Sequence, residues 1–481
     1  MQQLLSIFRA ARLVGASRGT LQKRIHDGEL PTFEGMIRAT DLLRLYPDTE
    51  LNHDTEYERV QHIKATAFAK RVHERLLPSS EVLTARVRQL AQELAASRLR
   101  LVHYEEIVDR LLQRLTATAD NDTDRAFARN LAEWLQSVLA EPMPDDEPAR
   151  RLLAHDTVLR VMSAHVTLQP SGHEFWLDGN DSLLEAGLRA GLALNYGCTN
   201  GNCGLCKARV VSGQVTRILN HDYVLSEAEK GMNYVLMCSN TAATDVAIEA
   251  LEAGGENDIP LQDLVAKVKG VSFPAPDMLL LHLQTPRVQR LRFLAGQFLT
   301  LSLADGHRLD LPIASCPCDD RNLLFHIRRR ADNPTSEKFF ILGKGDEVRL
   351  TGPHGDFLLD ENSRRSRLFL AYETGFAPIK SLIEHAMSLD QGEDMHLYWA
   401  VAGEGGHYAH NLCRAWHDAL ENFHYHPIIG NAAVDRVIAD HPHLPDCDVY
   451  LAGPQPTVAH DAAQLQAAGL PAAQLKIYAA L

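Results

Sequence analysis

The sequence predicts a multidomain protein: a small helical unit followed by a long helix, an α+β domain, an antiparallel β-barrel and an α/β domain with a parallel sheet. A chain of 481 residues is too long for a single hydrophobic core. A heptad pattern marks the long helix, and short strands give way to alternating strands and helices in the C-terminal half. The predicted units are residues 1–50, residues 51–150 with a linker at their end, and residues 155–253, 258–362 and 363–481.

The composition is typical of a soluble globular protein, with 45% hydrophobic and 23% charged residues. No run approaches about 18 uncharged apolar residues, and the first residues carry charges and lack a signal-peptide cleavage site. We therefore expect a cytoplasmic protein without a membrane partner. The formal net charge of -14 disfavours general attraction to nucleic acid, although residues 1–115 are slightly basic and could face a polyanion.

Residues 4–46 predict a helix, a tight turn, a second helix, a short strand-like wing and a third helix. Gly15 breaks the first helix, and apolar residues form a shared face of the first two helices: Leu13, Val14, Leu21 and Ile25. The stretch "AARLVGASRGTLQKRIHDGEL" resembles the winged helix-turn-helix of the MerR-type and excisionase-like DNA-binding families. The resemblance implies that the second helix enters the major groove and presents to DNA the side chains of Arg18, Gln22, Lys23 and Arg24. A small helical domain that contacts other proteins is the alternative.

A heptad pattern of apolar residues predicts the long helix. Its a positions are Val87, Leu94, Leu101, Val108 and Leu115, and its d positions are Leu83, Leu90, Ser97, Tyr104 and Leu111. β-branched and leucine residues at a, with leucine-rich d positions, favour a parallel two-stranded coiled coil and hence a homodimer. A long helical hairpin within one chain is the alternative. A further helix is expected at residues 123–140, followed by a linker at "EPMPDDEPARR".

The stretch "NYGCTNGNCGLC", residues 195–206, places three cysteines in one short loop. Cys198, Cys203 and Cys206 have the spacing C-x4-C-x2-C, and Cys238 follows in "NYVLMCSN". That is the plant-type ligand spacing for a [2Fe-2S] cluster. Small residues between the ligands let backbone N–H groups point at sulfur: Gly197, Gly201, Asn202 and Gly204. Zinc is the alternative metal, but its sites usually use two C-x2-C pairs.

The segments around this loop predict a hairpin at "VTLQPSGHEFWLDG", a helix at "DSLLEAGLRAG" and a strand at "CKARVVSGQV". The region from about 160 to 250 therefore resembles a plant-type ferredoxin domain over its whole length, which implies an α+β fold of the β-grasp type. The four remaining cysteines lack such a frame, and we expect buried free thiols at Cys316, Cys318, Cys413 and Cys447.

The C-terminal half predicts a barrel and then an α/β domain. After residue 258 the strands "LVAKVKGVSF", "MLLLHLQTP", "FLTLSLAD", "NLLFHIRRR" and "DEVRLTGPHGDF" predict the barrel, and alternation of strands and helices from residue 367 predicts a parallel sheet. With "GQFLTLSL", "GPHGDF", "TGFAPIKSLIEHA" and "AGPQPTV", this order resembles the ferredoxin-NADP reductase family, as in the reductase components of bacterial oxygenases. The resemblance implies a flavin between the two domains, a nicotinamide cofactor on the α/β domain, and electrons that pass from hydride to flavin to cluster.

The resemblance also implies which residues contact the two cofactors: Ser315, His326, Arg328, Ser336, Gly352, Thr374, Gly375, Pro378, Gly453 and Pro454. Other contact positions depart from the family. Leu309, Leu311 and Pro312 replace the arginine, tyrosine and serine that bind flavin. Tyr372 and Glu373 replace two glycines at a phosphate-binding turn, and two alanines, Ala402 and Ala452, replace an arginine and a cysteine. The sequence therefore predicts a [2Fe-2S] cluster, leaves FAD open and disfavours NAD(P)H.

Two functions are compatible with these features. A helix-turn-helix-like unit in the same chain as a cluster favours a dimeric redox-responsive regulator. In such a regulator the reductase half would be a platform for sensing or for docking. The alternative is an NAD(P)H-dependent oxidoreductase that passes electrons through flavin and the cluster to a protein acceptor. Scaffolding alone is a third interpretation. The predicted partners are a second copy of the chain, DNA, and a protein electron-transfer partner.

Overall fold

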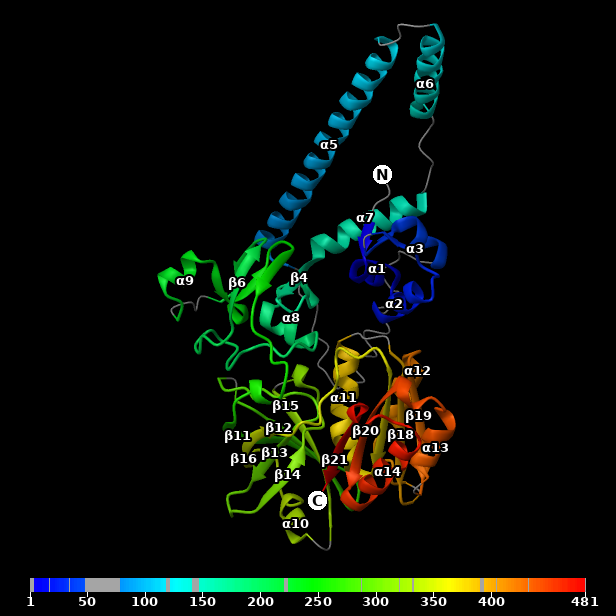
Figure 1. Cartoon of the computed structure of the whole chain (residues 1–481). Helices are drawn as coiled ribbons and strands as arrows, with labels where there is room; N and C mark the ends of the chain where they lie inside the picture. The colour runs from blue at the N-terminus through cyan, green and yellow to red at the C-terminus, as the bar shows by residue number, and fades with distance from the viewer. Residues whose placement is uncertain are drawn as a thin grey trace.

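The computed structural model describes residues 4–16, 18–33, 35–47, 78–117, 122–140, 147–219, 224–286, 288–319, 321–330, 333–389, 393–403, 405–430 and 432–480. Figure 1 shows the N-terminal unit (residues 4–47) and the domain that contains the cysteine loop (residues 163–249, the cysteine-loop domain) above the barrel and the α/β unit. Helices α5 (Ser80–Ala117) and α6 (Asp122–Ala140) project from them as an arm. Residues 48–77, part of the predicted long-helix unit, lie outside the described part. Within the described residues, no helix has the length and apolar character needed to cross a membrane.

The N-terminal unit consists of three helices and a small antiparallel sheet. Its elements are β1 (Leu4–Ser6), α1 (Ile7–Val14), α2 (Arg18–His26), β2 (Thr32–Phe33), β3 (Met36–Arg38) and α3 (Ala39–Leu45), with strand order β1-β3-β2. The Ser6 hydroxyl caps α1 by accepting the N–H of Arg9, and Gly15 ends α1 in the left-handed conformation with φ of +68°. The three helices and the two-stranded wing follow the predicted order, whereas β1 was not predicted, and DNA binding by this unit stays a prediction.

Three further helices connect this unit to the cysteine-loop domain: α5 (Ser80–Ala117), α6 (Asp122–Ala140) and α7 (Glu147–Met162). The predicted linker at 141–151 is wrong in its second part, because α7 begins at Glu147 and buries Leu152 in the core of the N-terminal unit. Helix α5 is anchored by Arg86, which is only 2% exposed. Its guanidinium donates to the carbonyls of Val161 at 2.9 Å and Ala242 at 3.1 Å, so the base of the arm is fixed to the cysteine-loop domain.

The cysteine-loop domain has a mixed sheet covered by one helix, as the α+β prediction requires. Its elements are β4 (Ser163–Gln169), β5 (Glu174–Asp178), α8 (Leu183–Arg189), β6 (Lys207–Ser212), β7 (Val215–Arg217), α9 (Glu227–Gly231), β8 (Tyr234–Leu236), η1 (Met237–Ser239), β9 (Asn240–Ala242) and β10 (Val246–Glu249). The main sheet has the order β5-β4-β10-β6-β8, in which only β4 and β10 run parallel. The N-terminal unit packs on this domain, since Arg12 lies 4.6 Å above the ring of Trp176.

The barrel is a six-stranded antiparallel sheet that nearly closes on itself. Its elements are η2 (Glu256–Asp258), β11 (Gln262–Ala275), β12 (Met278–Gln284), β13 (Phe298–Ser302), β14 (Arg308–Pro312), η3 (Pro317–Asp319), β15 (Asn322–Arg328), α10 (Pro334–Phe339) and β16 (Glu347–His354). The strand order is β14-β13-β16-β11-β12-β15. The two edge strands meet where the N–H of Ala314 donates to the carbonyl of Leu324 at 2.8 Å. The sequence prediction omitted β14.

The α/β unit is a parallel sheet with helices on both faces. Its elements are β17 (Ser366–Tyr372), η4 (Glu373–Gly375), α11 (Phe376–Ser388), β18 (Met395–Val401), α12 (His410–Ala419), β19 (Phe423–Ile429), α13 (Ala433–Asp440), η5 (Leu444–Asp446), β20 (Cys447–Pro454), α14 (Gln455–Ala467), η6 (Ala472–Gln474) and β21 (Leu475–Ala480). The order β19-β18-β17-β20-β21 is fully parallel. One core includes residues of α11 and α12, and the other includes residues of α13 and α14. The alternating pattern thus predicted this unit correctly, except for the omitted α13.

Candidate functional site

The loop between α8 and β6 carries Cys198, Cys203 and Cys206, and η1 carries Cys238, so that the four predicted cysteine ligands form two pairs. The Sγ atoms of Cys206 and Cys238 lie 3.3 Å apart, although the two residues are separated by 32 positions. Cys203 hydrogen-bonds to Cys198, and its backbone N–H lies 3.3 Å from the Cys198 sulfur. Cys198, Cys206 and Cys238 are buried, and Cys203 is exposed at the outer side of the loop.

The surroundings of these sulfurs favour the thiolate form in each pair. Burial alone would raise the pKa of Cys198, but backbone N–H groups of Asn200, Cys203 and Asn202 point at its sulfur and lower that pKa. A hydrogen bond from the Cys206 thiol lowers the pKa of Cys238 to about 6, while the pKa of Cys206 itself is raised. Thiolates are the form of cysteine that binds metal, so the loop is prepared for that role.

Glycines give the loop the close turns that this arrangement needs. Gly201 and Gly204 have φ of +83° and +74°, in the left-handed region that residues with a Cβ rarely adopt. A Cβ on Gly197 would lie 2.8 Å from the Leu205 side chain. The sequence prediction that these glycines shape the loop agrees with these positions.

Two pairs of cysteines suit a two-iron cluster better than a single ion. Among the described residues, no group of three His, Cys, Asp or Glu side chains is arranged around one metal ion. A [2Fe-2S] cluster takes four cysteine ligands, two on each iron. The donor set of Cys198 with Cys203 and Cys206 with Cys238 therefore fits the cluster.

Two arginines before β13 fasten the cysteine loop to the barrel. The backbone N–H of Arg290 donates to the carbonyl of Gly197 at 3.1 Å. The guanidinium of Arg292 donates to the side-chain oxygen of Asn195 at 2.7 Å. Sequence reasoning missed these residues, although the basic stretch "RVQRLRF" between two predicted strands was a signal. Because of these contacts, the loop has a fixed position against the barrel.

Several side chains predicted to bind cofactor are engaged by the protein itself. The hydroxyl of Ser315 accepts the N–H of Leu324 at 3.2 Å, and the hydroxyl of Ser336 donates to the carbonyl of Asn333 at 2.7 Å. His326 hydrogen-bonds through Nδ1 to the hydroxyl of Tyr408 at 3.0 Å, and burial holds the pKa of His326 well below its usual value. These groups satisfy one another without a ligand.

The remaining predicted contacts lie at strand ends or in packed turns. Gly352 is on β16, Thr374 and Gly375 form η4, Pro378 is buried in the first turn of α11, and Gly453 and Pro454 end β20. A Cβ on Gly375 would lie 2.2 Å from the carbonyl oxygen of Ala452, and one on Gly453 would lie 2.6 Å from Cβ of Tyr372. Packing of the strand ends therefore requires both glycines, with or without a cofactor.

The turn after β17 does not fit a dinucleotide phosphate. The carboxylate of Glu373 forms an ion pair with Arg328 and accepts the N–H of Ala402 at 2.7 Å. Tyr372, the other residue that replaces a glycine, is no obstacle there, because its hydroxyl hydrogen-bonds to Asp461 of α14. The site thus holds a negative charge where a phosphate would need positive groups and free N–H donors.

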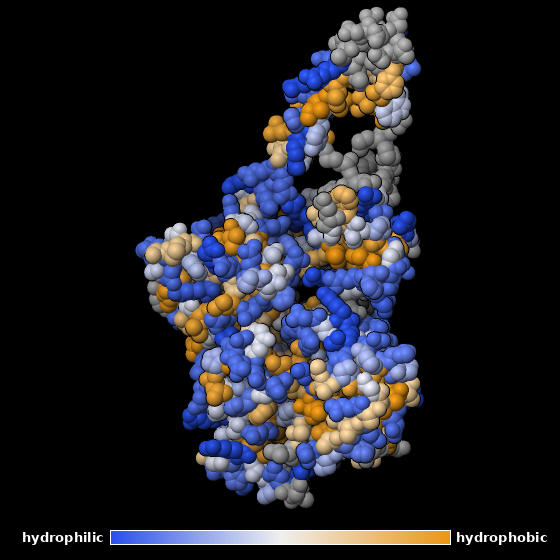
Figure 2. Space-filling view, viewed as in Figure 1, coloured by the Kyte–Doolittle hydropathy of each residue, from blue (hydrophilic) through white to orange (hydrophobic). Residues whose placement is uncertain are grey.

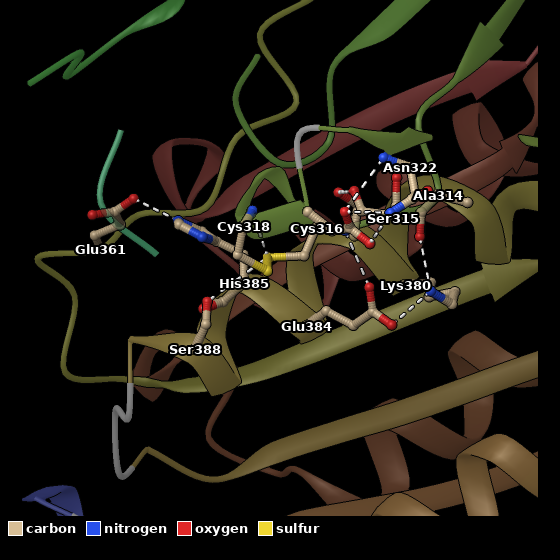
Figure 3. The surroundings of a disulfide bond; sticks show 12 residues. Ala314, Ser315, Cys316, Cys318, Asn322, Glu361, Lys380, Glu384, His385 and Ser388 are labelled. Atoms are coloured by element: carbon tan, nitrogen blue, oxygen red, sulfur yellow. Dashed lines mark hydrogen bonds and ion pairs between the residues drawn. A yellow bond between two sulfur atoms is a disulfide. The ribbon is translucent and has the colours of Figure 1, made fainter. Parts of the chain in front are cut away.

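The prediction of four free thiols outside the cysteine loop is wrong for two of them. Cys316 and Cys318 form a disulfide, whereas Cys413 and Cys447 are buried free thiols as predicted. Figure 3 shows this disulfide beside α11, where the N–H of Cys316 donates to Glu384 at 3.1 Å. The disulfide is possible because only Pro317 separates the two cysteines, whose Cα atoms lie 5.2 Å apart.

The residues predicted to contact DNA lie on α2, and two of them face the α/β unit. Gln22 accepts a hydrogen bond from Arg364 at 3.3 Å, and Lys23 lies 3.6 Å from the carboxylate of Asp394. Arg24 covers the ring of Tyr46 and lies 3.7 Å from Glu29, while Arg18 begins the helix. A DNA duplex would have to displace the contacts to the α/β unit.

Known proteins match the cysteine-loop domain and the reductase half. Residues 166–243 match the family of 2Fe-2S iron-sulfur cluster binding domains. The CDP-6-deoxy-L-threo-D-glycero-4-hexulose-3-dehydrase reductase of Yersinia pseudotuberculosis is 30% identical over 269 residues, which cover 56% of this chain and 80% of that protein. The chain belongs to the family of reductases with a [2Fe-2S] domain.

Two further members of this family are components of multi-protein systems. Reductase component 1 of terephthalate 1,2-dioxygenase from Comamonas sp. is 30% identical over 277 residues, which cover 57% of this chain and 82% of that protein. The reductase subunit of the aromatic O-demethylase of an Amycolatopsis species is 32% identical over 230 residues, which cover 46% of this chain and 68% of that protein. These matches cover about half of this chain, and the helix-turn-helix and coiled-coil assignments stay predictions.

Proposed function

We propose that the protein is a reductase-type electron carrier that passes single electrons through a [2Fe-2S] cluster to a protein acceptor. Cys198, Cys203, Cys206 and Cys238 would hold the cluster. When bound, such a cluster accepts and releases one electron at a time. The observation that carries the proposal is the set of two thiol pairs, in a domain that matches cluster-binding domains and that two arginines fasten to the barrel.

The position of the loop supports a protein acceptor. Cys203 is exposed, and the neighbouring Leu205 has half of its surface in contact with solvent. An acceptor could therefore approach the ligands directly, with an apolar side chain at the contact. The acceptor would be a redox protein that docks at this loop.

The proposal is tested with protein purified without air. We expect visible absorption that bleaches on reduction, with iron and acid-labile sulfide at about two each per chain. The chemically reduced protein should then reduce a protein acceptor such as cytochrome c. Flavin released by heating would show whether FAD is bound. A colourless protein, or zinc without sulfide, would contradict the proposal.

A redox-responsive regulator is the second candidate function. Contacts that join the N-terminal unit and the arm to the cysteine-loop domain favour it, namely Arg12 on Trp176 and Arg86 on Ala242. The backbone of Ala242 follows the predicted ligand Cys238 by only four residues, so a change at the cluster has a short route to α5. Matches to reductases favour the electron carrier, and DNA remains only a predicted partner.

We also propose that α5 pairs with α5 of a second copy in a parallel coiled coil. Several a and d side chains of its outer part are about half exposed: Leu94, Leu101, Tyr104 and Leu111. Figure 2 shows apolar side chains along this projecting arm. In a parallel pair, Arg100 at g would face Glu105 at e of the partner, so the charges are complementary.

Replacing Leu94 and Leu101 together by Glu should convert the dimer to a monomer, because the seam would bring like charges together. Light scattering after gel filtration measures the mass. Leu99 provides a matched control, since it is also exposed on α5 but occupies the f position outside the seam. Leu99→Glu should remain dimeric. A wild-type chain that elutes as a monomer at micromolar concentration would contradict the coiled coil.

A further inference from the structure

Glu373 directly follows β17, at the carboxyl ends of the parallel strands. Folds of this kind bind their ligands at these strand ends. The chain order reverses between β17 and β20, and ligands of open α/β sheets bind outside the carboxyl ends of the strands at that point. The backbone of Glu373 has φ of +52°, in the left-handed region that favours glycine. The turn therefore has a glycine-like shape but carries a charged side chain.

The carboxylate of Glu373 binds the two kinds of donor that a phosphate would use. One oxygen accepts the N–H of Ala402, directly after β18, at 2.7 Å, and the other pairs with the guanidinium of Arg328. Backbone N–H groups and arginine are common phosphate donors in proteins. The indole N–H of Trp399 donates to the carbonyl of Glu373 at 3.0 Å and so fixes the turn in this orientation.

The same ion pair joins the barrel to the α/β unit. Arg328 belongs to β15 of the barrel, and Glu373 follows β17 of the α/β unit. Next to this pair, the ring of Phe376 stacks on Trp399 with centroids 4.1 Å apart. A diphosphate that binds to these donors must therefore displace a carboxylate that is tethered beside them, and a tethered group competes at high effective concentration.

We propose that Glu373 is an internal substitute for a nucleotide phosphate, and that residue 373 determines whether the α/β unit binds a nicotinamide dinucleotide. With Glu373 in place, NADH and NADPH bind weakly, because binding costs both the ion pair and the hydrogen bond to Ala402. With glycine in place, Arg328 and the N–H of Ala402 become available to the diphosphate.

The test is titration calorimetry of the full-length protein with NADH and with NADPH. Glu373→Gly should bind at least one of the two dinucleotides about tenfold more tightly than the wild type. The carboxylate that occupies Arg328 and the N–H of Ala402 is then absent, so these donors are available to the diphosphate. Asp277→Asn is the matched control. The carboxylate of Asp277 also lies near Arg328, 3.4 Å from Nε, but it belongs to the turn between β11 and β12 of the barrel and not to the α/β unit. Asp277→Asn should leave the affinity unchanged.

Equal affinities of the wild type and Glu373→Gly would overturn the proposal, as would an equal gain in Asp277→Asn. Glycine at φ of +52° relieves backbone strain, so Glu373→Gly should fold. If it does not, Glu373→Asn decides in its place, since asparagine tolerates the same backbone conformation and cannot carry the charge. Dinucleotide binding is measured without electron transfer, so its failure is distinguishable from failure of the electron-carrier function.

Discussion

Cys238→Ala protein is expected to be colourless and to lose electron transfer to any acceptor. Cys238 pairs with Cys206 at 3.3 Å and comes from a different element than the other three ligands, so its loss leaves one iron with a single thiolate. Electron transfer to cytochrome c from the chemically reduced protein should fall by more than about a hundredfold, beyond the effect usual for residues that only support a metal ligand. Visible absorption and sulfide content measure the cluster independently.

Cys447→Ala is the control for this experiment. Cys447 is also a buried free thiol, but it begins β20 in the α/β unit, far along the chain from the loop. It should keep its absorption and its electron transfer. If Cys238→Ala retained a full cluster signal, the ligand assignment would be wrong, and the four-thiol arrangement would be no more than packing.

The cysteine loop was predictable because its information is local. Three of the four predicted ligands and the glycines between them lie within residues 195–206, and their spacing is the plant-type spacing for a [2Fe-2S] cluster. The parallel sheet was predictable for a similar reason, since its central strands β17 and β18 are mostly apolar and buried, and each is followed by a helical pattern. In both cases neighbours in the sequence carry the physical constraint.

The omitted elements lack such local signals. Strand β14, Arg308–Pro312, alternates exposed and half-buried residues and contains Asp310, so it reads as a loop. Helix α13, Ala433–Asp440, has no side-chain cap at its first residue, and packing of Val434 and Val437 on the sheet supports it instead. Helix α13 does space Val434, Val437 and Ile438 as one apolar face, but over only eight residues, so that tertiary contacts decide both elements.

The candidate site was only partly predictable, because the contacts of Glu373 and of Asn195 involve residues far away in the sequence. The loss of glycine at Glu373 was visible as a negative charge in a phosphate-binding turn. Its partner Arg328 is 45 positions away and belongs to another domain, so the ion pair became apparent only in the structure. The same is true of Arg292, which is 97 positions from Asn195.

Gly296→Ala is expected to destabilise the reductase half strongly, because this glycine lies where the barrel meets the α/β unit. A Cβ at this position would lie 1.9 Å from the carbonyl oxygen of Phe357 and 3.0 Å from the side chain of Leu382 on α11. The φ of +92° adds strain of about 1 kcal/mol for any residue with a Cβ. The backbone of Phe357 must move, and overpacking of this kind costs about 1–3 kcal/mol.

Gly306→Ala separates the two contributions, because Gly306 has φ of +91° but no atom within 4 Å of an added Cβ. Both variants carry the same backbone strain, and only Gly296→Ala carries the clash. In calorimetric scans, the transition of the reductase half should therefore fall by about 5 °C more in Gly296→Ala than in Gly306→Ala. Equal shifts would mean that the backbone near Phe357 yields freely. In that case the close packing of Gly296 against Phe357 and Leu382 would not be needed to join the barrel to the α/β unit.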